Sequence, residues 1–302
     1  MKTIFLIVIC FFVIFSSVLL AGWLVIHRFN GSFISNGVKR KYILYVPISY
    51  DPSTPTPLVI SMHGFGDWSA HQMHMSGWND LADEKSFIAV YPMGTHFPLR
   101  WQLYDYENPA ANPTADIRFI SDLIDHLEED YNIDPNRIYA NGLSNGGGMA
   151  QALSCTLSDR IAAVGSVSGA YIYPLNACQP VRPVPIIAFH GTADTIVPYQ
   201  GGPSERFHHP FPSIPEFMEK IAQRNGCTAS PIEQTVSQNV HSISYTGCTA
   251  NADVVFYTIE DGGHSWPGGK IMPHMIVGET NMEINATRLM WNFFQAHPLR
   301  KG

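Results

Sequence analysis

Short apolar runs bounded by turn residues recur along the chain and predict a sheet of buried strands. The run at residues 58–62 (Leu-Val-Ile-Ser-Met) is short, almost wholly apolar, and followed by a glycine-containing turn. Such runs are typical of parallel strands that are covered on both faces. Residues 41–46 alternate instead, which also predicts a strand. Strands are thus predicted at residues 41–46, 58–62, 87–92, 137–140, 162–169, 184–189 and 254–259.

Segments with helical spacing of apolar residues lie between these strands. Residues 116–131 place five large aliphatic side chains on one face of a helix. Helices are also predicted at residues 149–153, 215–226 and 283–296. Strands that alternate with helices predict an α/β protein, with a mostly parallel sheet flanked by helices on both faces. Roughly 270 residues follow the hydrophobic N-terminus, a size that one α/β domain commonly reaches, so we expect a single domain over residues 38–299.

The N-terminus, residues 1–26, is hydrophobic and predicts a signal peptide or a signal anchor. Residues 3–26 carry no charge, and this stretch is long enough to span a bilayer. The best cleavage site ends at Ala21 and has Leu19 at the −3 position, where a small residue is preferred. This mismatch favours an uncleaved anchor, followed by a polar spacer at residues 27–37. Basic residues on both flanks leave the orientation open.

The cysteines favour export of the domain. Cys10 lies in the hydrophobic segment, and the other four have neither a C-x-x-C spacing nor a histidine at ligand spacing, so no zinc site is expected. An even number of cysteines predicts two disulfides in an oxidising compartment. Four buried free thiols in a cytosolic protein are the alternative. Three connectivities are possible, and we favour the sequence-local pairs Cys155–Cys178 and Cys227–Cys248.

Charge and composition exclude several classes of function. The chain has 18 Lys and Arg residues against 25 Asp and Glu residues, and no basic cluster is interleaved with aromatic residues. Nucleic-acid binding is therefore not expected. The sequence has no phosphate-binding loop and no metal-ligand spacing, so it predicts neither a cofactor nor a metal. We expect a monomer.

The segment Gly142-Leu143-Ser144-Asn145-Gly146 lies between the predicted strand at 137–140 and the predicted helix at 149–153. Gly-x-Ser-x-Gly in this context predicts a nucleophile elbow, a tight turn that needs small residues two positions before and after the serine. The Ser144 hydroxyl would then lie at a helix N-terminus, where negative charge on a reacting oxygen is stabilised. Because the motif also occurs by chance in glycine-rich loops, its meaning depends on partner residues.

A candidate acid and a candidate base follow later strands. Folds with a nucleophile elbow have the chain order serine, acid, histidine, and these two residues fit that order. Asp194 follows the strand at 184–189, and His264 follows the strand at 254–259 after two glycines. Loops at the carboxyl ends of parallel strands meet at one edge of the sheet. We therefore predict Ser144, Asp194 and His264 as a catalytic triad. The competing acids Asp253 and Asp261 do not follow a strand at the required place. The structural alternatives are an Asx-turn residue for Asp194 and a surface-loop residue for His264.

The loop at residues 63–66 (His-Gly-Phe-Gly) follows an early strand and is the candidate oxyanion loop. In such a fold one backbone amide of this loop and the amide after the nucleophile bind the oxyanion, which selects Phe65 and Asn145. We expect His63 to brace the loop by hydrogen bonding, and His190, in a second His-Gly pair, to be structural. Loop aromatic residues such as Trp101 are candidates for lining a substrate cleft.

Several strings together resemble one family, the secreted polyhydroxybutyrate depolymerase-like esterases, the group that also holds feruloyl and acetylxylan esterases. The resemblance covers residues 31 to 298, and its most specific string is Gly-Gly-His-Ser-Trp-Pro-Gly at residues 262–268. The other strings are residues 40–47, 63–64, 142–147, 190–194 and 197–199. The resemblance implies an α/β-hydrolase fold, secretion, His264 as base, Asp194 as acid and Trp266 as a wall of the acyl pocket. It also supports an oxidised pair of Cys227 and Cys248.

The resemblance implies a serine carboxylic-ester hydrolase that acts through an acyl-enzyme on short polyester or oligomer esters, or on feruloyl- and acetyl-type esters. Three alternatives stay open: a feruloyl or acetylxylan esterase acting on cell-wall polysaccharide, a serine peptidase on the same scaffold, and a non-enzymatic binding protein. No polymer-binding module is recognised in the sequence, which favours soluble substrates. The expected location is extracellular or periplasmic, with possible anchoring by residues 3–26.

Overall fold

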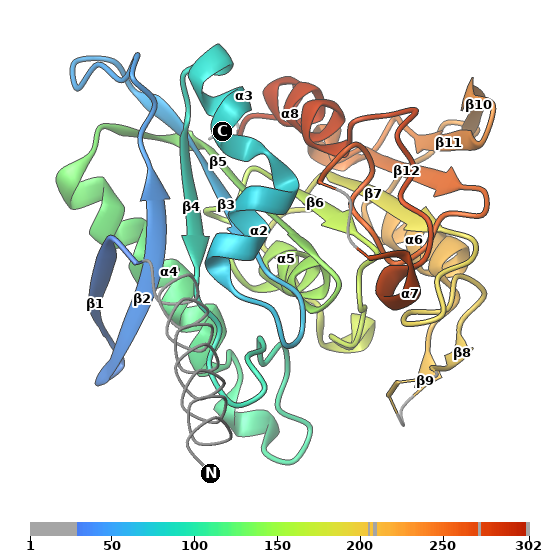
Figure 1. Ribbon diagram of the computed structural model, residues 1–302, viewed down its shortest axis with the longest axis horizontal. Coiled ribbons are helices and arrows are strands. Elements are labelled where there is room, and N and C mark those ends of the chain that lie inside the picture. Colours follow the sequence, from blue (N-terminus) through green and yellow to red (C-terminus); the bar gives the residue numbers. More distant parts are fainter. Residues whose placement is uncertain (1–28, 205, 208–209, 271–272, 300–302) are drawn as a thin grey trace, which may run out of the picture.

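The computed structural model describes residues 29–204, 206–207, 210–270 and 273–299. Its main feature is a ten-stranded sheet with the order β1-β2-β4-β3-β5-β6-β7-β12-β11-β10 (Figure 1). From β4 to β12 neighbouring strands are parallel, and the outer pairs on both sides are antiparallel. The strands are β1 (Gly31–Ser35), β2 (Val38–Tyr45), β3 (Thr56–Met62), β4 (Ile88–Pro92), β5 (Ile133–Leu143), β6 (Ala163–Val167), β7 (Ile186–Gly191), β10 (Ile232–Ser237), β11 (Val240–Tyr245) and β12 (Val254–Ile259), beside a small pair of β8 (Gly202–Pro203) and β9 (Pro210–Phe211).

Helices cover both faces of this sheet (Figure 1). One apolar cluster packs α4, α5 and α6 on one face, and a second packs α2, α3 and α8 on the other. The predicted mostly parallel sheet with helices on both faces is confirmed. The helices are α2 (Ser69–Ser76), α3 (Trp78–Lys85), α4 (Ala115–Asp130), α5 (Asn145–Thr156), α6 (Ile214–Arg224), α7 (His274–Val277) and α8 (Ala286–Ala296), with short 3-10 turns η1 (Pro109–Ala111), η2 (Leu175–Ala177) and η3 (Thr249–Asn251).

Helix α4 forms as its apolar spacing predicts. The aliphatic side chains of its inner face are completely buried against the sheet. At its start, the Thr114 hydroxyl accepts a hydrogen bond from the Ile117 N–H at 3.3 Å, which satisfies one of the free amides of the first turn. Caps of this kind contribute about 1 kcal/mol. The helix therefore begins at a fixed point, next to the loop that borders the site described below.

Two disulfides join the pairs favoured from the sequence, Cys155–Cys178 and Cys227–Cys248. The first links the last turn of α5 to the segment after η2. The second links the segment after α6 to the start of η3. Both predicted pairs are confirmed, and the alternative of four free thiols is wrong.

The predicted spacer at residues 27–37 is not simply a linker. Residues 31–35 form β1, which pairs antiparallel with β2 at the edge of the sheet. Phe33 anchors the strand, because its ring stacks on His126 at 4.6 Å and contacts Phe119 at 5.8 Å. The strand has five residues and one large inward-facing side chain, Phe33, which is only partly buried, so its sequence shows no clear alternation.

No helix in the described part of the chain is long and apolar enough to cross a bilayer. The hydrophobic segment predicted at residues 3–26 lies outside the described residues.

Candidate active site

Ser144 occupies the turn between β5 and α5, as the Gly-x-Ser-x-Gly motif predicts. Its backbone has φ 56° and ψ −117°, a region that non-glycine residues rarely adopt. The neighbouring glycines are required by close packing: a Cβ on Gly146 would lie 2.2 Å from the Met62 carbonyl oxygen, and one on Gly142 would lie 2.4 Å from the carbonyl carbon of Gly146. The strained turn thus holds the Ser144 side chain at the N-terminus of α5.

Asp194 and His264 meet although 70 positions separate them in the sequence. The Asp194 Oδ2 and the His264 Nδ1 are 2.7 Å apart, and both residues are buried. Burial by itself raises the pKa of Asp194, but the nearby His264 and His190 outweigh it and hold that pKa well below its usual range. The carboxylate therefore accepts a hydrogen bond from the Nδ1–H of His264, which leaves Nε2 of that ring with a free lone pair.

Asp194 is fixed from two further directions. Its Oδ1 accepts hydrogen bonds from the N–H groups of Ile196 at 2.9 Å and Val197 at 2.8 Å. The His190 Nε2 lies 2.8 Å from the Val197 carbonyl oxygen and 3.3 Å from the Asp194 Oδ2. His190 was expected to be structural, and the structure places it directly against the carboxylate. The sequence offered one indication of this contact: Asp194 follows His190 by four residues, in the turn directly after β7.

The predicted oxyanion loop is braced by His63, as expected. The His63 Nε2 accepts a hydrogen bond from the Gly94 N–H at 3.0 Å, so its Nδ1 carries the proton and donates to the Gly64 carbonyl at 2.7 Å. Burial lowers the pKa of His63 and keeps the ring neutral. Within the described residues, neither the Phe65 N–H nor the Asn145 N–H donates to a protein acceptor. Both predicted amides are therefore free to bind an oxygen.

The neutral state of His63 predicts a pH dependence of stability. Because its pKa is lowered on folding, the unfolded chain takes up a proton below about pH 6.5 that the folded chain does not. We expect the free energy of unfolding to fall as the pH decreases below that value, by up to about 1.4 kcal/mol per pH unit for this one group. Urea unfolding of wild type and His63→Gln across this range measures the effect. An unfolding free-energy difference between the two proteins that does not vary with pH contradicts the prediction.

Two cavities meet at Ser144. The first has a volume of about 290 Å³ and the second about 640 Å³. Phe65 and Phe207 line both cavities, and their rings pack edge to face with the ring centres 5.4 Å apart. His264 lines the second cavity with Ser144. Asn145 lines the first.

Both cavities combine apolar walls with a few polar and charged groups. The first has an aromatic and aliphatic wall, with His96, Arg100 and Gln102 beside it; the wall is formed by Trp101, Leu103, Tyr104, Ala170, Ile172 and Phe211. The second carries polar and charged groups from Asp67, His71 and Arg206, beside the indole of Trp68. The His71 Nδ1 lies 2.8 Å from an oxygen of Asp67, and this bond raises the pKa of His71. Leu143, Ile196, Phe207, Ile276 and Val277 also line the second cavity, so neither side of Ser144 is distinctly the more polar one.

The two tryptophans predicted to bind substrate occupy different places. Trp101 lines the first cavity. Trp266 lines neither cavity: it is 1% exposed, and its Nε1 donates to the Thr287 hydroxyl of α8 at 2.9 Å. The prediction for Trp266 is therefore corrected, because packing against α8 turns its ring away from the cavities. In the described part of the chain, no group of three His, Cys, Asp or Glu side chains is arranged to hold a metal ion.

Comparisons with known proteins agree with this architecture. The sequence profile of the Phospholipase/Carboxylesterase family matches residues 47–209. Feruloyl esterase B of Piromyces equi is 31% identical over 245 residues, which cover 77% of this chain but only 44% of that protein. Probable feruloyl esterase C of Aspergillus clavatus is 29% identical over 276 residues, covering 88% of this chain and 86% of that protein. The solved acetyl xylan esterase from Aspergillus awamori shares the fold, with a TM-score of 0.59, 15% identity, and coverage of 76% of this chain and 93% of that one.

Proposed function

Because the chain belongs to the Phospholipase/Carboxylesterase family, we propose that it is a serine carboxylic-ester hydrolase that acts through an acyl-enzyme. One observation carries the proposal. A buried carboxylate, Asp194, holds the proton on Nδ1 of His264, and that histidine lines the same cavity as a strained serine at a helix N-terminus. This is the arrangement that activates a serine hydroxyl for attack on an acyl carbon.

The proposed reaction uses two acyl transfers. The Ser144 Oγ attacks the ester carbonyl carbon while Nε2 of His264 takes its proton. The carbonyl oxygen becomes an oxyanion that accepts hydrogen bonds from the Phe65 and Asn145 amides. When the ester C–O bond breaks, His264 returns the proton to the leaving alcohol. Water then attacks the acyl-enzyme by the same steps, which releases the carboxylic acid and restores Ser144.

The two cavities support an assignment of the two halves of the substrate. The alcohol leaves on the side of the group that protonates it, so the second cavity, which His264 lines, is proposed to hold the alcohol. The first cavity is then proposed to hold the acyl group. Its smaller volume and aromatic wall suit a compact apolar or aromatic acid. The larger second cavity has room for a bulkier alcohol, and Asp67 and Arg206 in its lining offer partners for hydroxyl groups.

This difference in cavity volume favours esters of carbohydrates with small or aromatic acids over a polyester, whose two halves are alike. The names of the feruloyl esterase relatives support the same choice. A short hydroxyalkanoate oligomer is the second candidate. We also propose that the enzyme is exported, because its two disulfides suit an oxidising compartment, and that it acts as a monomer. Anchoring by residues 3–26 is part of this proposal.

Activity on four substrate types tests the proposal: p-nitrophenyl acetate, methyl ferulate, hydroxybutyrate oligomers and a peptide amide. We expect hydrolysis of the aryl ester and of methyl ferulate, and a fluorophosphonate probe bound covalently to the peptide that contains Ser144. Cleavage of the peptide amide in preference to esters would instead indicate a peptidase. An unlabelled, inactive protein would indicate a binding function.

A further inference from the structure

Trp101 makes polar contacts with both halves of the proposed oxyanion hole. Its indole Nε1–H donates to the His63 carbonyl at 2.9 Å, two residues before Phe65. Its backbone N–H donates to the Asn145 Oδ1 at 2.6 Å, and its carbonyl accepts from the Asn145 Nδ2 at 3.1 Å. One residue is thus bonded to the loop that supplies one amide and to the residue that supplies the other.

These bonds pair every polar group of Trp101 and both polar atoms of the Asn145 side chain. Trp101 is 2% exposed, and its ring packs on His63 with the ring centres 5.2 Å apart. The side-chain amide of Asn145 is paired twice with one backbone peptide unit, which fixes its orientation. These two bonds hold the Asn145 side chain in place, and they therefore also restrict the position of its backbone N–H. A substrate-lining role alone does not require these three bonds.

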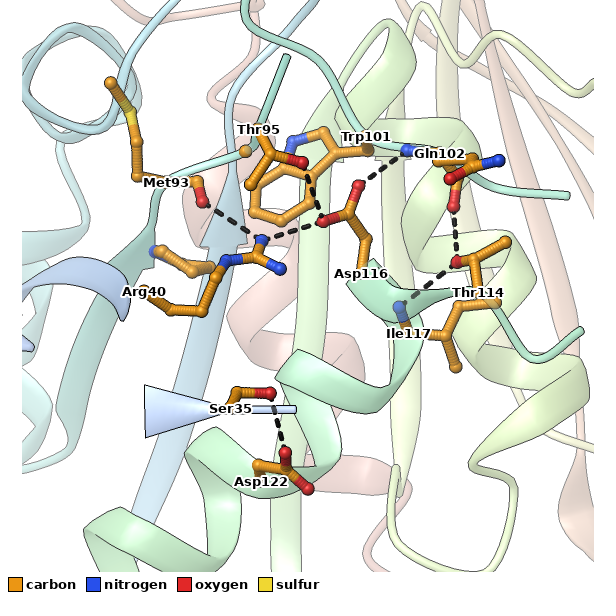
Figure 2. Close-up of polar contacts among 12 residues, drawn as sticks. Ser35, Arg40, Met93, Thr95, Trp101, Gln102, Thr114, Asp116, Ile117 and Asp122 are labelled. Carbon is orange, nitrogen blue, oxygen red and sulfur yellow. Dashed lines mark hydrogen bonds and ion pairs between the residues drawn. The ribbon is translucent and has the colours of Figure 1, made fainter. Parts of the chain in front are cut away.

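A buried ion pair of Arg40 and Asp116 holds the segment around Trp101 through the backbone of the next residue, Gln102. The Asp116 Oδ1 accepts from the Arg40 guanidinium at 2.8 Å, and its Oδ2 accepts from the Gln102 N–H at 2.8 Å. Figure 2 shows Asp116 between Arg40 and the backbone next to Trp101. The Thr95 hydroxyl donates to the same carboxylate at 3.3 Å. Arg40 and Asp116 are 4% and 2% exposed, so this support lies in the protein interior.

Two more bonds tie the same segment to its surroundings. The Gly66 N–H donates to the Leu99 carbonyl at 2.7 Å, which joins the oxyanion loop to the segment just before Trp101. On the other side, the Thr114 hydroxyl donates to the Gln102 carbonyl at 2.6 Å and caps α4 (Figure 2). The segment is therefore held at α4 and β2 and presents Trp101 toward the oxyanion hole.

We propose that Trp101 is a positioning residue of the oxyanion hole: it fixes the spacing of the Phe65 and Asn145 amides by bonding to both sides. This inference rests on the proposed function, because it needs an oxyanion to form at Ser144. Donors of this kind act only when they are aimed at the position of the developing charge, so a small displacement reduces transition-state stabilisation. The ground state of the bound ester depends on them much less.

Trp101→Phe is the central test, because it keeps an aromatic ring and both backbone bonds to Asn145 but removes the bond to His63. With p-nitrophenyl acetate we expect kcat to fall about 10- to 100-fold while KM changes by less than about 2-fold. A trifluoromethyl ketone, which forms a tetrahedral adduct with the serine, is expected to bind more weakly by about the same factor as kcat/KM. A loss confined to KM, or unchanged affinity for the ketone, overturns the proposal.

Trp78→Phe is the matched control. Trp78 is also fully buried and donates its Nε1–H, to the Asn141 Oδ1 at 3.1 Å, but it packs among Phe87 and Phe294 and lines neither cavity. We expect it to lower the melting temperature and to leave kcat within about 2-fold. An equal fall of kcat in both variants shows a merely structural effect and overturns the proposal.

Asn145→Ala provides a second, independent variant if Trp101→Phe does not fold. It keeps the backbone amide of residue 145 and removes both side-chain bonds to Trp101, so the same loss in kcat with little change in KM is expected. Fluorophosphonate labelling of the wild type separates the two hypotheses. If Ser144 is not labelled, the proposed function fails. If Ser144 is labelled and both variants keep full kcat, only the role of Trp101 fails.

Discussion

Ser144→Ala is expected to lower kcat for p-nitrophenyl acetate by at least about 10⁴-fold. The reason is that, among the described residues, Ser144 carries the only hydroxyl group in the lining of the cavity that also contains His264. The oxyanion donors and the cavities persist in the variant, so a small residual rate over the uncatalysed reaction is expected. Steady-state kinetics, together with the melting temperature, measures both the loss and the integrity of the fold.

Ser154→Ala is a matched control on the same helix. Ser154 is buried on α5, and its hydroxyl donates to the Gln151 carbonyl at 2.7 Å, away from both cavities. We expect this variant to keep kcat within about 2-fold. Substantial turnover by Ser144→Ala under the same conditions would contradict the role of Ser144 as the nucleophile.

The parts of the site that the sequence predicts are those set by local geometry. The elbow around Ser144 depends on a glycine two residues away on each side, and both are visible as a spacing. Asp194 and His264 each follow an apolar strand, and parallel topology brings the ends of such strands to one edge. The order of the strands and the motif together thus sufficed to select three residues that lie far apart in the chain.

The side chains around the triad were harder to predict because tertiary packing decides their direction. Trp101 and Trp266 both lie in loops that follow predicted strands, but of the two only Trp101 lines a cavity next to Ser144. The Trp266 indole bonds to Thr287 of α8 instead. The ion pair of Arg40 and Asp116 joins residues 76 positions apart. Asp116 has the pattern of an ordinary first-turn residue of a helix, so nothing local indicates that it bonds to Arg40 and to the backbone next to Trp101.

Helix α2 was missed for a related reason. Its buried residues include Ser69, Gln72 and Ser76, which hydrophobic periodicity counts as exposed. Their burial is tolerated because each makes a hydrogen bond inside the protein. The Ser69 hydroxyl donates to the Pro92 carbonyl at 3.0 Å, Gln72 to the Ser61 hydroxyl at 2.9 Å, and the Ser76 hydroxyl to the Gln72 carbonyl at 2.7 Å. The β10–β11 hairpin was also missed, because most of β10 is exposed and its sequence alternates weakly.

Asp194→Asn is expected to lower kcat about 10⁴-fold while leaving the cavities intact. An asparagine at this position can present an N–H to the ring, which places the proton on Nε2 of His264, and this tautomer cannot accept the proton of Ser144. Asparagine also lacks the charge that stabilises the protonated ring in the transition state. The neighbouring His190 cannot supply that charge. Measuring kcat and KM separately is informative, because the loss is expected in kcat.

The same substitution at Asp261 is the matched control, because Asp261 was the competing acid nearest to His264 in the sequence. Asp261 is exposed and has φ 54°, a backbone conformation that asparagine tolerates well. We expect Asp261→Asn to keep kcat within about 2-fold. A larger loss of kcat in Asp261→Asn than in Asp194→Asn would show that Asp261, and not Asp194, is the acid of the triad.

The pH dependence of the free energy of unfolding provides a second test of Asp194, and its direction can be predicted. Its pKa is lowered on folding by His264 and His190 against the effect of burial, so its ionisation stabilises the fold above the ordinary carboxyl value of about 4. That contribution is lost as the pH falls below this value. The difference in free energy of unfolding between wild type and Asp194→Asn should therefore be largest near neutral pH and shrink toward acid. A difference that grows toward acid would mean that the Asp194 carboxyl is protonated in the native enzyme, which is incompatible with its holding the Nδ1 proton of His264.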